Sequence, residues 1–152
     1  MIRDNRLTFS ATVSPLPLNT GAAGSYVIGD TIDLTTTGRD IGAGEGAGDL
    51  FLVIMVAAAA TSGGAATAQF NLITSDASNM SSPTVITGTQ AFPLASLGAG
   101  AQLLAIRLPA AVYKRYLGLQ QVTGTAAFTG GSIYAFFAED VNAIRFYPQA
   151  FS

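Results

Sequence analysis

The residues that come nearest to a chemical site are five acidic side chains, Asp30, Asp33, Asp40, Glu45 and Asp49. Carboxylate oxygens are the ligands that calcium prefers in proteins, so this stretch could hold a calcium ion. The five residues lack the alternating aspartate spacing of a calcium-binding loop. We therefore interpret them as solvated loop carboxylates, and we expect no metal and no other cofactor.

The glycine-rich stretch Gly42 to Ala47 matches a loose form of the dinucleotide-binding fingerprint. That fingerprint needs a strand before it and a helix after it, because the phosphates bind at the amino terminus of the helix. Here the apolar run Leu50 to Ala60 follows, and its β-branched residues favour a strand. The chain also has no phosphate-binding GxxxxGK[ST] loop. We interpret the stretch as a turn.

The choice of catalytic groups is narrow because the chain contains neither cysteine nor histidine. This composition excludes disulfides, thiolate catalysis and the usual general base near neutral pH. The remaining candidates are the acidic residues, including Glu139 and Asp140, together with Lys114 and scattered hydroxyls. Paired carboxylates that hydrolyse glycosides normally work in an aromatic cleft, and this chain has no tryptophan. We predict that the protein is not an enzyme.

The charge of the chain argues against nucleic acid and membrane as partners. Charged residues make up only 11% of the sequence and the net charge is −2, whereas phosphate binding needs clustered lysine and arginine. The longest apolar run, Leu50 to Ala60, is well short of the roughly 20 residues of a membrane-spanning helix. The first residues contain no continuous apolar segment of a secretory signal. We expect the protein to act where it is made or in a particle assembled there.

The pattern of the chain predicts an all-β fold. The run Leu50 to Ala60 reads as a central strand covered on both faces, with a buried helix as the alternative. Eight or nine short strands alternate with glycine and proline turns, including strands over Leu7 to Val13, Tyr26 to Ile28 and Ile32 to Leu34. This spacing is typical of an antiparallel β-sandwich or barrel. The length fits a single domain, 1–152, with a short amino-terminal arm (1–6) and a carboxy-terminal tail (140–152).

One further strand, Ile133 to Ala138, is apolar on both faces. Ile133, Ala135 and Phe137 would face one side, and Tyr134 and Phe136 the other. We expect from this pattern that one sheet buries its outer face in a neighbouring copy, which makes the protein a homo-oligomer, either a dimer or a trimer.

Several short motifs occur in a characteristic order along nearly the whole chain. They are Arg39-Asp40-Ile41-Gly42 with Gly44-Glu45, Leu108-Pro109, Arg115-Tyr116-Leu117-Gly118-Leu119, and Thr129-Gly130-Gly131 before a strand with Ala135. In this order and spacing the chain resembles the small capsid cement, or decoration, proteins of tailed bacteriophages, of the type first known from a Bordetella phage. The extra Gly46-Ala47-Gly48 lengthens the glycine loop relative to that family.

The resemblance implies a jelly-roll-like sandwich that is made in the host cytoplasm and sits in the virion, on the outer surface of the capsid. There it would tie neighbouring subunits of the major capsid protein together without performing a reaction. Three segments and one further arginine would then contact the partner: Ile2, Arg3 and Arg6 in the arm; Arg39, Asp40, Glu45 and Asp49 in the glycine-rich loop; Arg145, Phe146, Tyr147 and Phe151 in the tail; and Arg115.

Other readings stay open at this point. The tail aromatics could instead pack back on the sandwich, and Arg115 could be an ordinary surface residue. The protein could also be a receptor- or glycan-binding virion module, with Tyr26, Tyr113 and Tyr147 exposed toward a glycan. A third possibility is a head-completion or tail component, which differs from a cement protein in copy number.

Overall fold

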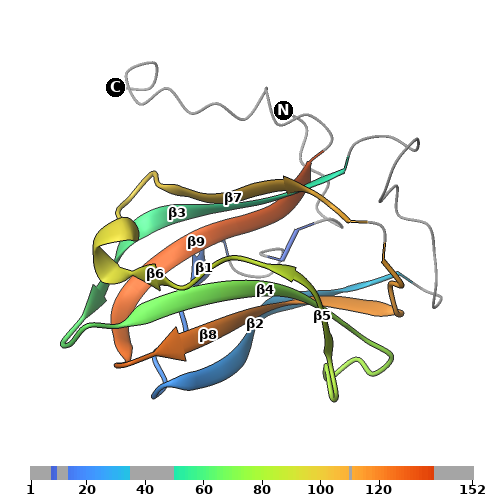
Figure 1. Ribbon diagram of the computed structural model, residues 1–152, viewed down its shortest axis with the longest axis horizontal. Coiled ribbons are helices and arrows are strands. Elements are labelled where there is room, and N and C mark those ends of the chain that lie inside the picture. Colours follow the sequence, from blue (N-terminus) through green and yellow to red (C-terminus); the bar gives the residue numbers. More distant parts are fainter. Residues whose placement is uncertain (1–7, 10–13, 35–49, 110, 139–152) are drawn as a thin grey trace.

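The protein is a sandwich of two antiparallel β-sheets, as the sequence pattern predicts (Figure 1). The computed structural model describes residues 8–9, 14–34, 50–109 and 111–138. The strands are β1 (Leu16–Pro17), β2 (Gly24–Asp33), β3 (Phe51–Ser62), β4 (Thr67–Ser75), β5 (Thr84–Gly88), β6 (Phe92–Pro93), β7 (Gln102–Arg107), β8 (Tyr116–Gly124) and β9 (Phe128–Ala138). A single 3-10 turn, η1 (Leu94–Ser96), follows β6.

The order of the strands is that of a jelly roll. One sheet, which we call sheet A, has the order β1-β9-β3-β7, and the other, sheet B, has the order β2-β8-β4-β5, with β6 paired to β4. The pairs are nested, since β1 pairs with β9, β2 with β8, β3 with β7 and β4 with β5. A long folded ribbon rolled into two layers gives this arrangement, and closing the layers on each other buries one face of each sheet.

The apolar run at the centre of the chain forms β3, which lies between β9 and β7 in sheet A. Its residues from Leu52 to Val56 are all buried, which confirms the prediction of a strand covered on both faces for this half of the run. In the other half Ala58 and Ala59 are exposed, so there the prediction was wrong. Leu52 and Ile54 point into the main core between the sheets. Val53 and Met55 lie on the outer face of sheet A in a second cluster with Phe136.

That second cluster bears on the expectation that sheet A buries its outer face in a neighbouring copy. The predicted alternation of β9 is present, with Ile133, Ala135 and Phe137 in the main core. On the outer face, however, Phe136 is only 3% exposed and Val53 only 1% exposed in a single chain. The centre of this face is therefore buried already without a second copy, so the pattern no longer supports an oligomer by itself.

The predicted strands Tyr26 to Ile28 and Ile32 to Leu34 join into one continuous strand, β2, which ends one residue earlier, at Asp33. Its register against β8 shifts between Ile28 and Ile32, so the two halves are joined by a bulge instead of a turn. Gly29 lies in this bulge with a φ of +73°, a conformation that glycine adopts at little cost. The Gly-Asp pair was misread as a turn because bulges and turns use the same residue types.

The start of the chain also differs from the prediction. Only Thr8 and Phe9 of the expected strand Leu7 to Val13 are described, and Thr8 forms an isolated bridge to Phe136. Phe9 is fully buried as predicted, but Thr8 is buried as well instead of facing water. Its hydroxyl donates a hydrogen bond to the carbonyl of Ala135. Pro15 directly precedes the next strand, β1, and Pro17 is part of it.

Candidate functional site

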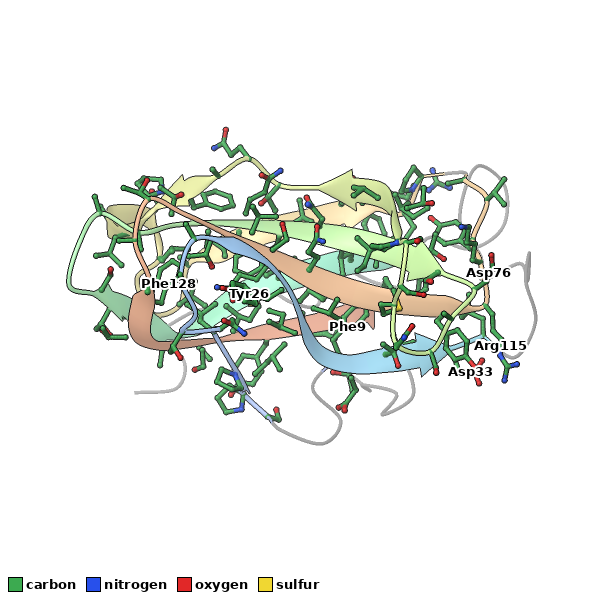
Figure 2. All side chains as sticks on the ribbon, turned by 90° about the horizontal axis from the view of Figure 1, so that it is seen from below. Phe9, Tyr26, Asp33, Asp76, Arg115 and Phe128 are labelled. Atoms are coloured by element: carbon green, nitrogen blue, oxygen red, sulfur yellow. The ribbon has the colours of Figure 1, made fainter. Side chains whose placement is uncertain are left out.

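Charged side chains gather at one end of the sandwich. The described residues include six charged ones, and five of them lie at or next to strand ends on the same side of the sandwich. Figure 2 labels three of these five, Asp33, Asp76 and Arg115. These five are Asp33 at the end of β2, Asp76 after β4, Arg107 at the end of β7, and Lys114 and Arg115 before β8. The sixth, Asp30, lies three residues before Asp33 in β2. We call this the charged end.

The best-defined contact of the charged end joins Arg115 to Asp33. The Arg115 Nε and Nη2 atoms donate hydrogen bonds of 3.0 Å each to the two carboxylate oxygens of Asp33. The guanidinium carbon also lies 5.0 Å from the ring centre of Tyr116. The hydrogen bond to Asp33 raises the pKa of the Arg115 guanidinium further above its usual value. Both side chains remain accessible, at 45% and 42%, so the pair is a fixed, exposed polar feature.

A second contact holds the connection between β7 and β8. The ammonium of Lys114 lies 3.7 Å from a carboxylate oxygen of Asp76. The backbone N–H of Lys114 donates a 2.8 Å hydrogen bond to the hydroxyl of Thr74. That hydroxyl in turn donates a hydrogen bond to the carbonyl of Tyr116. Thr74 is fully buried, and the two hydrogen bonds fix the backbone that presents Lys114 and Arg115.

The segments that the sequence predicts to contact a partner leave the sandwich at this same end. The residues before and after the glycine-rich loop are held here, since the Leu34 N–H bonds the Arg115 carbonyl and the Leu108 N–H bonds the Leu50 carbonyl. Strand β9 ends here at Ala138, opposite Phe51. The chain before Thr8 enters here too, because Thr8 pairs with Phe136 near the end of β9.

The side chains of those segments lie outside the described residues. They are Ile2, Arg3, Arg6, Arg39, Asp40, Glu45, Asp49, Arg145, Phe146, Tyr147 and Phe151. Among the predicted contact residues, Arg115 is therefore the one that the described structure places. Sequence reasoning missed Asp33, Asp76 and Lys114 as members of the same surface, because only the strand order brings them together.

The opposite end of the sandwich has a different character. The described connections 18–24, 63–66, 89–101 and 125–127 contain no charged residue. Gln121, which is fully buried, fastens the first of them: its amide oxygen accepts from the Asn19 N–H, and its amide nitrogen donates to the Asn19 carbonyl and to Thr123. This end is thus uncharged in its described connections, and Gln121 ties the first of them to β8.

Two of the three tyrosines proposed for glycan binding have structural roles. Tyr113 is buried, and its hydroxyl donates a 2.7 Å hydrogen bond to the Pro109 carbonyl. Burial raises the pKa of Tyr113 to about 12. Tyr26 packs against the main core and donates to the Ala22 carbonyl. The Tyr113 ring is therefore covered, whereas the Tyr26 ring is half-exposed; Tyr147 lies outside the described residues.

The described part of the chain contains no group of three acidic, histidine or cysteine residues that could hold a metal ion, and Asp30 and Asp33 belong to no such group. None of its helical segments is long and apolar enough to cross a membrane. Buried hydroxyls serve the fold, as when Ser75 donates to the Ser81 carbonyl and Thr89 accepts from the Phe70 N–H.

The fold and the charged end define a jelly-roll protein with one polar, loop-bearing end. A comparison with family models matches residues 19–137, most of the chain, to the family named Bbp16. The chain therefore belongs to the Bbp16 family, whose name points to a protein of a Bordetella phage. No curated protein matches the chain.

Proposed function

We propose that the protein is a structural component of a phage virion that binds the outer surface of the capsid. It stabilises the shell by bridging neighbouring subunits of the major capsid protein, and it catalyses no reaction. The observation that carries this proposal is that the two ends of the domain differ. Five of the six described charged residues, and the points from which all the predicted contact segments leave, lie at one end of a jelly roll of the Bbp16 family.

The charged end fits docking for a physical reason. Exposed ion pairs contribute little to the stability of their own domain, typically 0 to about 1 kcal/mol, so their concentration here points to an intermolecular role. Charged groups across an interface set orientation and suppress wrong partners more than they add affinity. The Arg115 and Asp33 side chains hold each other, and Arg115 also lies over the Tyr116 ring, so less entropy is lost when a partner binds them.

Bridging follows from having several contact segments on one rigid body. The arm, the glycine-rich loop and the tail leave the same end, so each could reach a different shell subunit. When one contact has formed, the others become intramolecular with a high effective concentration, and weak contacts then combine into tight binding. The extensive hydrogen bonding between strands supplies the stiffness that this mechanism requires.

The first test is the copy number of the protein in purified virions, by quantitative mass spectrometry against the major capsid protein. A number comparable to that of the major capsid protein is the expected result. A handful of copies per particle would instead assign the protein to the head-completion or tail apparatus, and its absence from particles would refute the proposal.

The second test asks whether the charged end is the docking end. Reversing one charge with Lys114→Glu should weaken binding to heads that lack the protein, measured by co-sedimentation. The control places a glutamate at the opposite end with Thr20→Glu, where the side chain is exposed, and should bind as the parent does. If both variants lost binding to the same extent, or if neither lost any, the assignment of the charged end as the docking end would be contradicted.

A further inference from the structure

The most exposed large hydrophobic side chain of the described residues is that of Val112, in the connection between β7 and β8. It is 79% exposed, whereas Val85 and Val27 are 53% and 43% exposed. Those two valines lie within β5 and β2, where the pleat of a strand turns alternate side chains outward. Single exposed apolar side chains are common on protein surfaces, so the setting of Val112 decides what it can do.

Two internal contacts hold the chain directly after Val112. Tyr113 is buried, and its hydroxyl donates a 2.7 Å hydrogen bond to the Pro109 carbonyl. The N–H of Lys114 donates a 2.8 Å hydrogen bond to the hydroxyl of Thr74, which is fully buried on β4. The backbone next to Val112 is therefore fixed before any partner binds. A valine side chain also has few rotamers to lose, so little entropy opposes its burial by a partner.

Val112 stands among the charged groups to which the proposed function assigns docking. Lys114 and Arg115 follow it within three residues, and a carboxylate oxygen of Asp76 lies 3.7 Å from the Lys114 ammonium. Protein interfaces combine an apolar centre with a polar rim. Charged groups mainly set orientation and select partners, so an apolar side chain at this end can supply affinity that the charges do not.

We propose that Val112 is the apolar contact of the charged end and inserts into a small apolar pocket of a capsid subunit. The inference rests on the proposed function and adds the chemistry of the partner. The pocket takes one branched side chain, and its rim carries polar groups that face Lys114 and Arg115. Complete burial of a valine side chain strengthens binding about ten-fold or more.

The first test is the binding of Val112→Thr to heads that lack the protein, measured by co-sedimentation. Threonine keeps the shape of valine but replaces one methyl with a hydroxyl, so binding should be about ten-fold weaker. Val27→Thr is the matched control on β2 and should bind as the parent does. Both variants should keep the urea midpoint of the parent, since substitutions of exposed side chains change stability little. Equal binding by Val112→Thr and the parent would overturn the proposal.

The variant Lys114→Glu separates this inference from the proposed function. If Lys114→Glu binds weakly while Val112→Thr binds fully, the apolar contact alone is wrong. If both bind fully, or if the parent does not bind heads, docking through the charged end is wrong as well. The defect of Lys114→Glu should diminish as salt is added, because ions screen exposed charges. The defect of Val112→Thr should persist in salt, and its disappearance there would contradict an apolar contact.

The burial of this side chain can be measured directly because the chain has no cysteine. Val112→Cys introduces a single thiol and keeps a small apolar side chain. Alkylation of this thiol should slow by about ten-fold when nine-tenths of the protein is bound to heads, since only the free fraction then reacts. The thiol of Val27→Cys should react at the same rate in free and bound protein. An equal rate in free and bound protein at position 112 would overturn the proposal.

Discussion

Phe9 offers a sharp test of how the amino-terminal segment joins the sandwich. Its ring is fully buried and meets Phe137 edge-on, with 5.4 Å between ring centres and 61° between ring planes. Its backbone joins the two sheets, because its N–H bonds the Ala135 carbonyl of sheet A and its carbonyl accepts from the Asp30 N–H of sheet B. Phe9 therefore closes the seam between the layers.

The substitution Phe9→Ala should be strongly destabilising. Truncating a buried phenylalanine costs about 3 to 5 kcal/mol, and the edge-on aromatic contact contributes part of this loss. The backbone hydrogen bonds remain, so the change reports side-chain packing. For a chain of this size each kcal/mol lowers the midpoint of thermal unfolding by about 2 to 4 °C, which gives a fall of about 6 to 20 °C.

The assay is urea unfolding at one protein concentration, followed by circular dichroism and tyrosine fluorescence, since the chain has no tryptophan. Phe9→Leu is the matched control, because it keeps most of the apolar volume and should lose only about 1.5 kcal/mol. A loss below about 1 kcal/mol for Phe9→Ala would show that the ring does not form part of the core, and the reasoning would then be wrong.

Three further predictions concern the bulge, the buried tyrosine and the charged end. Gly29→Ala should lower the free energy of unfolding by at least about 2 kcal/mol, since the residue has a positive φ and an added Cβ would meet the Phe9 carbonyl; equal urea midpoints for variant and parent would contradict this. Because the unfolded tyrosine loses its proton near pH 10 and folded Tyr113 only near pH 12, stability should fall by up to about 2 kcal/mol as pH rises between these values. In the variant Tyr113→Phe the loss of stability between these two pH values should be smaller by this amount. If the variant showed the same dependence of stability on pH as the parent, burial of Tyr113 would not be its cause. A double-mutant cycle with Asp33→Ala and Arg115→Ala should give a coupling of about 1 kcal/mol or less, and a much larger value would mean that the pair is a stability element and not a surface for docking.

The sequence by itself determined the fold class and most of the strands. Hydrophobic period and turn residues are local properties, and they correctly indicated β3 as a strand, buried on both faces in its first half, and the alternation of β9. The absence of histidine and cysteine, which limits the available chemistry, is likewise read directly from the composition. The bulge at Gly29 and the burial of Thr8 were misjudged, because both depend on contacts with strands far away in the chain.

The tertiary structure alone decided which strands are neighbours and therefore what gathers at each end. Asp33, Asp76 and Arg115 are far apart in sequence, and no local pattern relates them. They meet because nested pairing places the ends of β2 and β4 beside the start of β8. The same pairing puts β7 at the end of the described strand order of sheet A, since the pairing of strands is set by how whole faces fit together and not by the residues of one strand.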